Sequence, residues 1–198
     1  ITLENIREQL AAGGPARSLD AARQRLIDAI HRAHAQVCQM AGARTELKGM
    51  GTTIVGLWLL QEKAVIVHVG DSRLYLLRKG ELKQITGDHS LAGELYRHGV
   101  LDTQAMARFP QKHVLTQAIG TEQGVTPDAT VIPVAPGDRF LLCTDGLNDM
   151  IETPTIRGFL GLPGSPSHCP RTLAEPPLSQ GGKANVTVVV IHILEIDA

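Results

Sequence analysis

Two pairs of short apolar runs between residues 52 and 86 constrain the fold of this chain most strongly. In the first pair, 52–60 and 63–69 are separated only by Gln61 and Glu62. In the second pair, 73–78 and 81–85 are separated only by Lys79 and Gly80. Connections this short join antiparallel neighbours, because a parallel pair needs a crossover of about a dozen residues or more. We therefore predict an antiparallel meander over 50–86, which argues against a Rossmann-like fold.

Helices are predicted on both sides of this meander. A first helix over 3–12 ends at the Gly-Gly-Pro cluster of 13–15. Ser18 stands at an N-cap position before a second helix over about 19–41. Residues 89–109 are predicted to form a helical segment that is interrupted near Gly99 and ends before Pro110. One apolar stripe of the second helix recurs every three or four positions and consists of Ala22, Leu26, Ile30, Ala33, Val37 and Met40.

Three further strands are predicted over 125–134, 138–144 and 185–193. The second of them is nearly all apolar, which is typical of a strand buried on both faces. Strands and helices are thus segregated along the chain, and this pattern predicts an α+β fold with helices packed against antiparallel sheets. The stretch 152–182 is rich in proline, so we expect a short helix near 154–161 and an irregular loop beyond it.

The length of 198 residues predicts a single domain over 1–198. A net charge of −1 and a 3% share of aromatic residues argue against a nucleic-acid-binding surface. No apolar run is long enough to span a membrane, and no signal-peptide pattern is present. Three widely spaced cysteines, Cys38, Cys143 and Cys169, suit a reducing cytoplasm better than a disulfide scaffold.

Three tight turns place polar residues at the ends of apolar strands. They span 70–73 (Gly-Asp-Ser-Arg), 86–90 (Thr-Gly-Asp-His-Ser) and 144–149 (Thr-Asp-Gly-Leu-Asn-Asp). Asp145 closes a buried strand, where it is either part of an Asx-turn or a metal ligand. Asp88 and His89 are either a ligand pair for a transition metal or part of a solvated turn. Asp71 and Arg73 are by default a structural pair within their turn.

The order of these turns resembles a bacterial metal-dependent protein serine/threonine phosphatase of the protein phosphatase 2C (PPM) family. The resemblance covers about 18–193. It rests on six short motifs. In sequence order they are Gly-Thr-Thr at 51–53, the turns at 70–73 and 86–90, Leu-Thr-Gln-Ala-Ile-Gly at 115–120, the turn at 144–149, and Gly-Gly-Lys-Ala-Asn-Val-Thr-Val-Val-Val at 181–190. Each motif is weak alone, whereas six in the right order and spacing are strong.

The resemblance implies a fold, a chemistry and a set of site residues. The implied fold is an antiparallel β-sandwich flanked by helices. The implied activity is hydrolysis of phosphoserine and phosphothreonine by a water activated at a two-metal Mn²⁺ or Mg²⁺ centre built from aspartates. Asp145 matches a ligand of that centre, and Asp88 matches a carboxylate of a third, weaker metal site. The structural residues near the site are Gly70, Asp71, Ser72, Arg73 and Gly146, and 92–120 matches a flap that affects substrate choice.

Two departures from the family pattern put the two-metal centre in doubt. The sequence has no match to the family's opening strands, which carry a phosphate-binding Arg and an Asp that bridges both metals. We therefore expect the N-terminus to be incomplete, and the strands that would pair with the missing ones to show unpaired edges. Ala184 stands where the last metal-binding Asp belongs. Since one carboxylate screens two close cations poorly, binding of Mn²⁺ or Mg²⁺ is expected to be weak or incomplete, and no catalytic side chain is assigned.

Three functions therefore stay open at this point. The first is a phosphatase domain that acts on phosphorylated proteins, with a cognate serine/threonine kinase as a further partner. The second is a catalytically impaired pseudophosphatase that binds phosphoproteins or kinases. The third is an unrelated α+β structural domain, whose stability would not respond to Mn²⁺.

Overall fold

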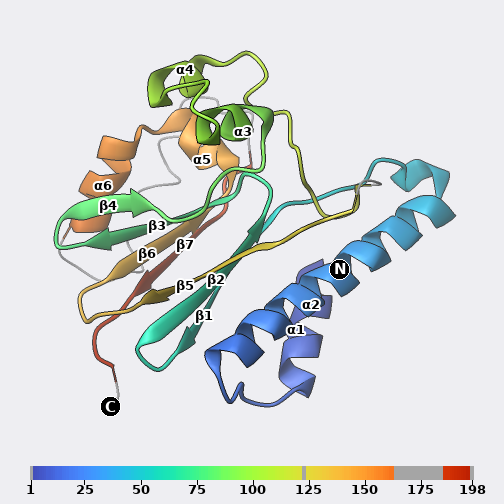
Figure 1. The fold of residues 1–198 in the computed structure, drawn as a ribbon, viewed down its shortest axis with the longest axis horizontal. Coiled ribbons are helices and arrows are strands. Elements are labelled where there is room, and N and C mark those ends of the chain that lie inside the picture. The colour runs from blue at the N-terminus through green and yellow to red at the C-terminus, as the bar shows by residue number, and fades with distance from the viewer. Residues whose placement is uncertain (1, 122–123, 163–184, 197–198) are drawn as a thin grey trace. The chain divides into compact units, whose positions relative to one another are not determined.

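The computed structural model describes residues 2–121, 124–162 and 185–196, and they form two compact units. The first unit comprises 1–71 with 88–132, and the second comprises 72–87 with 133–198. Each unit contains one β-sheet with helices (Figure 1).

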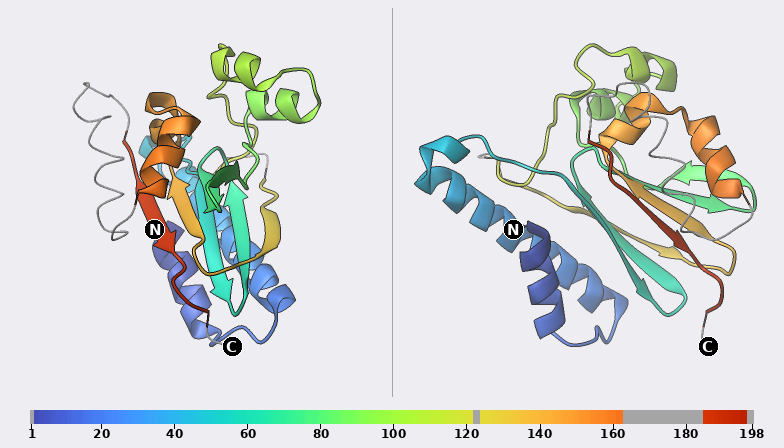
Figure 2. Two further views of the ribbon diagram at one scale, coloured as in Figure 1. Left: turned by 90° about the vertical axis from the view of Figure 1, so that its left-hand side faces the viewer. Right: turned by 180° about the vertical axis from the view of Figure 1, so that it is seen from behind.

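Two helices form the N-terminal part of the first unit: α1 (Thr2–Ala12) and α2 (Leu19–Ala43), which pack against each other (Figure 2). The side chain of Ser18 accepts a hydrogen bond from Ala21 N at 3.1 Å, and this confirms the predicted N-cap of α2. The predicted apolar stripe of α2 is buried from Ala22 to Val37, and Met40 is partly buried.

The sheet of the first unit has the order β1-β2-β5, with β1 (Ile54–Leu60), β2 (Lys63–Val69) and β5 (Asp128–Pro133). β1 and β2 form an antiparallel hairpin in which Leu60 pairs with Lys63. Every second residue of β2 (Val65, Val67 and Val69) joins the core cluster that also contains the stripe of α2. The apolar face of α2 therefore covers this sheet, and β1 is one of its edges.

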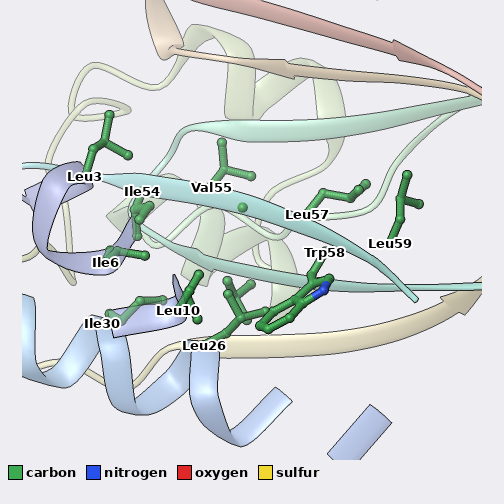
Figure 3. Close-up of a pocket in the computed structure, with 12 residues that line it drawn as sticks. Leu3, Ile6, Leu10, Leu26, Ile30, Ile54, Val55, Leu57, Trp58 and Leu59 are labelled. Atoms are coloured by element: carbon green, nitrogen blue, oxygen red, sulfur yellow. The ribbon is translucent and has the colours of Figure 1, made fainter. Parts of the chain in front are cut away.

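An apolar pocket of about 410 Å³ lies within the first unit, where α1, α2 and β1 meet. Figure 3 shows Leu3, Ile6 and Leu10 of α1 around it, together with Trp58 of the edge strand β1. The guanidinium of Arg25 lies 5.2 Å from the centre of the Trp58 ring. This cation–π contact ties α2 to the same edge strand.

A short 3-10 helix, η1 (Thr45–Leu47), and two short helices, α3 (Leu91–Arg97) and α4 (Thr103–Arg108), complete the first unit. The side chains of Ser90 and Asp102 cap α3 and α4, respectively. This agrees with the predicted interruption near Gly99 and the stop before Pro110. Two isolated bridges, Thr52 with Ile119 and Ser90 with Leu115, tie the segment after α4 back to the rest of the unit.

The sheet of the second unit has the order β4-β3-β6-β7 and is antiparallel throughout. Its strands are β3 (Arg73–Arg78), β4 (Glu81–Gln84), β6 (Arg139–Cys143) and β7 (Val188–His192). Two helices, α5 (Asp145–Met150) and α6 (Thr153–Gly161), follow β6. Their buried residues Leu147, Ile156 and Leu160 pack with Tyr75 and Leu141 in one core cluster.

The predicted strands and helices are confirmed in type and, within a few residues, in position. The continuous meander over 50–86 is wrong, because β2 and β3 belong to different sheets. β2 is the central strand of its sheet, with β1 on one side and β5 on the other, so neither of its edges can pair with β3. In the turn after β2, Gly70 has φ +102°, and a Cβ on it would collide with the side chain of Thr53.

The stretch 152–182 contains α6, so it is helical at its start, as the pattern near 154–161 indicated. The rest of that stretch, Cys169 and Ala184 lie outside the described residues. Among the described residues, no helix is both long and apolar enough to cross a lipid bilayer.

Candidate functional site

Asp145 is the first residue of α5 and follows directly after the buried strand β6. It is exposed, so its carboxylate is accessible from solvent. The Oδ1 atom accepts a hydrogen bond from Gly146 N at 2.9 Å, which fixes the orientation of the carboxylate. Both interpretations from the sequence, a turn residue and a metal ligand, are compatible with this position, and the ligand role stays a prediction.

A series of hydrogen bonds between polar side chains connects α5 to β3 and β6. Arg73 Nη1 donates to the hydroxyl of Tyr75 at 3.1 Å, and that hydroxyl donates to Asn148 Oδ1 at 2.7 Å. Asn148 Nδ2 in turn contacts Cys143 Sγ at 3.6 Å. Arg73 of the predicted near-site turn is thereby connected to the helix that carries Asp145, within one unit. The sequence singled out Arg73 but not Tyr75 or Asn148.

Two hydrogen bonds between the residue after β6 and the residue before β7 hold the turn before α5. The hydroxyl of Thr144 accepts from Thr187 N at 3.1 Å, and Thr144 N donates to Thr187 O at 3.1 Å. The segment before β7 is therefore fixed beside Asp145.

Asp88 lies in the first unit and is buried, with 7% of its surface exposed. Its carbonyl oxygen faces Gly93 so closely that any Cβ at residue 93 would collide with it. Two residues after Asp88, Ser90 caps α3 by accepting from Gly93 N at 3.1 Å. The backbone of Asp88 is thus locked against the first turn of α3.

His89 connects the Asp88 turn to the end of β2. Its backbone N–H donates to Gly70 O at 3.0 Å, and its Nδ1 accepts from Gly70 N at 3.3 Å. The structure therefore brings together parts of two predicted turns, namely residues 70–71 of the turn 70–73 and residues 88–90 of the turn 86–90, within the first unit. Ser72, Arg73, Asp145 and Gly146 belong to the second unit.

Two residues that the sequence analysis did not select, His68 and Asp128, lie next to His89. The rings of His68 and His89 stack with centres 4.5 Å apart, and His89 Nε2 lies 3.2 Å from Asp128 Oδ2. A signal for His68 exists in the sequence, because a histidine inside an otherwise apolar strand needs polar partners when buried. Asp128 comes from 39 residues further along the chain and carries no such signal.

The segment that matches the family's flap, 92–120, contains a small polar cluster. The hydrogen bond from Arg97 and its charge lower the pKa of Glu94, and a bond from the Thr116 hydroxyl adds to this. Thr116 N also donates to His89 O at 2.9 Å. A role for the flap in substrate choice stays a prediction.

The donor chemistry of Asp145 and Asp88 fits Mn²⁺ or Mg²⁺, since hard divalent cations prefer carboxylate oxygens. Asp145 offers an exposed, oriented carboxylate, and Asp88 offers a carboxylate on a rigid turn. The position of Ala184 lies outside the described residues. Asp145 is therefore the one carboxylate from the predicted two-metal core that the described residues present.

The antiparallel sheets flanked by helices define an α+β fold that is similar to the fold of a solved serine/threonine phosphatase. The family model "Protein phosphatase 2C" matches residues 1–168. The chain belongs to the protein phosphatase 2C family.

Named relatives agree with this family. The chain is 36% identical over 163 residues to the "Serine/threonine phosphatase stp" of Listeria welshimeri, which covers 82% of this chain and 65% of that protein. The fold of this chain matches that of the S. agalactiae serine/threonine phosphatase with a TM-score of 0.89 at 30% identity. The match covers 97% of this chain and 78% of the S. agalactiae chain. The catalytic domain of PstP in complex with two manganese ions matches with a TM-score of 0.83 at 30% identity, over 98% and 81% of the two chains.

The predicted fold class, α+β with antiparallel sheets and flanking helices, is confirmed by these matches. The chain spans about 65% of the length of the curated relative from Listeria.

Proposed function

We propose that the chain is a protein serine/threonine phosphatase domain, which hydrolyses phosphoserine and phosphothreonine in proteins with Mn²⁺ or Mg²⁺. The observation that carries this proposal is Asp145, an exposed and oriented carboxylate at the end of a buried strand, in a chain of the protein phosphatase 2C family. When bound, the metal would lower the pKa of a bound water and stabilise charge on the phosphoryl group.

The roles of the chain's own residues follow from their positions. Asp145 would hold a cation of the central site, and Asp88 would hold a cation of a weaker, separate site. Arg73, Tyr75 and Asn148 would keep α5 in place, because their hydrogen bonds connect β3 to that helix. Gly146 would keep its N–H directed at the Asp145 carboxylate.

We further propose a setting for this activity. The substrates would be phosphorylated proteins, as the names of the relatives suggest, and a serine/threonine kinase would supply them. The sparse cysteines favour the cytoplasm as the compartment. Residues 1–198 would act as one phosphatase-like domain.

A specific observation favours a second function. Ala184 replaces the Asp of the Gly-Gly-x-Asp-Asn motif, so the chain lacks one expected metal ligand. A pseudophosphatase of this family would bind phosphoproteins or kinases without turnover.

Hydrolysis of p-nitrophenyl phosphate by the full chain, with and without Mn²⁺, tests the first proposal. We expect turnover that EDTA abolishes and that Asp145→Ala lowers by at least about a hundredfold, since that variant removes a proposed metal ligand. Glu152→Gln is the matched control, because Glu152 is also an exposed carboxylate of the second unit and should leave the rate unchanged.

The outcomes separate the two functions. Equal rates for Asp145→Ala and the parent chain would contradict the assignment of Asp145. Absence of turnover together with binding of a phosphoserine peptide, measured by calorimetry, would favour the pseudophosphatase. Absence of both would contradict the proposed function altogether.

A further inference from the structure

His68, His89 and Asp128 form a buried polar cluster in the first unit that the proposed function does not use. His89 is 1% exposed and His68 is 4% exposed, whereas the side chain of Asp128 is 54% exposed and reaches in from the surface. The three side chains place ligand atoms within 4.8 Å of one another, which is also compatible with a metal ion. The hydrogen bonds of His89 decide between these possibilities.

The hydrogen bonds of His89 indicate which of its ring nitrogens is the acceptor. Gly70 N–H donates to Nδ1, and an imidazole nitrogen that accepts a hydrogen bond carries no proton of its own. The ring proton is therefore on Nε2, which lies 3.2 Å from the carboxylate of Asp128 and donates to it. A metal at Nε2 would displace that proton to Nδ1, where it would face the Gly70 N–H. Two donors would then oppose each other, so the geometry disfavours a metal ion here.

We propose that Asp128, His89 and Gly70 form a metal-free positioning relay that fixes the turn carrying Asp88. The carboxylate of Asp128 holds the proton on Nε2, and this leaves Nδ1 as the acceptor for Gly70 N. The stacked ring of His68 holds the plane of the imidazole. Asp128 is thus a positioning residue, and the step toward Asp88 rests on the proposed metal-binding function.

The relay acts on Asp88 through the backbone. His89 binds Gly70 twice, once through its own N–H and once through Nδ1, so residues 88–89 cannot move away from the end of β2 while both bonds persist. Gly70 itself is held in a left-handed conformation against Thr53. Thr116 N adds a third bond, to His89 O, from the predicted flap. Loss of the Asp128 carboxylate would leave a buried Nε2–H without its acceptor and would favour the other tautomer.

The first test measures the tautomer of His89 in the metal-free chain by long-range ¹H–¹⁵N NMR, with His89→Gln to assign the signals. We expect the Nε2–H tautomer in the parent chain. A parent chain in which Nδ1 carries the proton would overturn the relay, and this measurement requires no variant of Asp128. A stoichiometric Zn²⁺ titration that shifts the His68 and His89 signals together would also overturn it, in favour of a metal site.

The second test compares Asp128→Ala, Asp128→Asn and the control Glu62→Gln, a charge loss at an exposed turn of the same unit. In Asp128→Ala we expect a mixed tautomer and amide exchange at Gly70 at least about tenfold faster. Asp128→Asn retains an oxygen acceptor and should restore most of the parent behaviour. An unchanged tautomer and unchanged exchange in Asp128→Ala would contradict the proposal.

The consequence for Asp88 is measured by Mn²⁺-induced broadening of the NMR signals of 86–90. We expect about tenfold weaker binding in Asp128→Ala, a typical loss when an orienting partner is removed, and no change in Glu62→Gln. Unchanged Mn²⁺ binding in a variant with an altered His89 tautomer would contradict the link to Asp88 but not the relay. The tautomer and amide-exchange measurements do not depend on phosphatase activity. A negative phosphatase assay would therefore contradict the proposed function without contradicting the relay.

Discussion

At the scale of single residues, Arg78 and Asp138 form an ion pair within the second unit. Asp138 is 1% exposed and accepts hydrogen bonds from Arg78 Nε at 2.8 Å, Arg78 Nη2 at 2.7 Å and Ala135 N at 2.8 Å. Burial by itself would raise the pKa of Asp138, but the bonds from Arg78 and Ala135 outweigh it and hold the pKa below its usual value. The same hydrogen bond raises the pKa of Arg78.

Asp138→Asn should therefore lower stability in a pH-dependent way. At pH 7 we expect a loss of about 2 kcal/mol in the free energy of unfolding, because a charged partner of Arg78 is removed. The folded-state pKa of Asp138 lies below the unfolded value of about 3.9, so its contribution is present above that pH and is lost as the pH falls through the folded pKa. Urea unfolding from pH 7 down to pH 3 measures this. A parent–variant difference that stays constant over this range would contradict the assignment.

The sequence identified some residues of the candidate site and missed others. Asp145 and Asp88 were found because each lies in a polar turn at the end of an apolar strand, and because the order of these turns resembles that of a known family. Tyr75 and Asn148 were missed because their hydrogen bond joins residues 73 positions apart. The same holds for His89 and Asp128, whose pairing depends on where β5 begins. Local patterns identify a polar residue but not the distant side chain that completes its network.

At the scale of elements, the first turn of α3 sets the position of the Asp88 turn. A Cβ at residue 93 would collide with the carbonyl oxygen of Asp88, and backbone atoms cannot yield as a flexible side chain does. Gly93→Ala should therefore lower the free energy of unfolding by about 2 kcal/mol, as overpacking does. Gly42→Ala is the control, since Gly42 lies in α2 with open space around it and should gain up to about 1 kcal/mol. Thermal unfolding of both variants measures this, and equal effects of the two would contradict the packing argument.

The elements themselves were predictable where a local signal sets both ends. Ser18 and the three-to-four spacing identified α2, and the Lys79-Gly80 pair, with positive φ at both residues, identified the β3–β4 hairpin. The break between β2 and β3 was not predictable in the same way, because a Gly-Asp-Ser turn between two apolar runs is also typical of a hairpin. The strand order β1-β2-β5 shows that both edges of β2 are already paired, so β3 belongs to the other sheet.

At the scale of the whole molecule, each compact unit is built from two separate stretches of chain. The hairpin 72–87 and the segment from 133 onward make up the second unit, so β3 pairs with β6 across more than sixty residues. Such long-range pairing cannot be derived from local patterns, which explains why the number and order of strands in each sheet came only from the structure. Because each unit contains two stretches of the chain, cleavage of the backbone at one position cannot separate the two units.

Because each unit carries one proposed metal-binding aspartate, Mn²⁺ should stabilise the chain by mass action. At a concentration about a hundredfold above the dissociation constant, the expected gain is about 2.7 kcal/mol for each site. Circular dichroism would follow both units, whereas the fluorescence of Trp58, the single tryptophan of the chain, would report on the first unit. Asp145→Ala should reduce the Mn²⁺-dependent shift seen by circular dichroism, and the control Glu152→Gln should keep it. A chain whose unfolding does not respond to Mn²⁺ by either probe would be a structural member of the family rather than a metal-dependent one, because a ligand that binds only the native state must stabilise it.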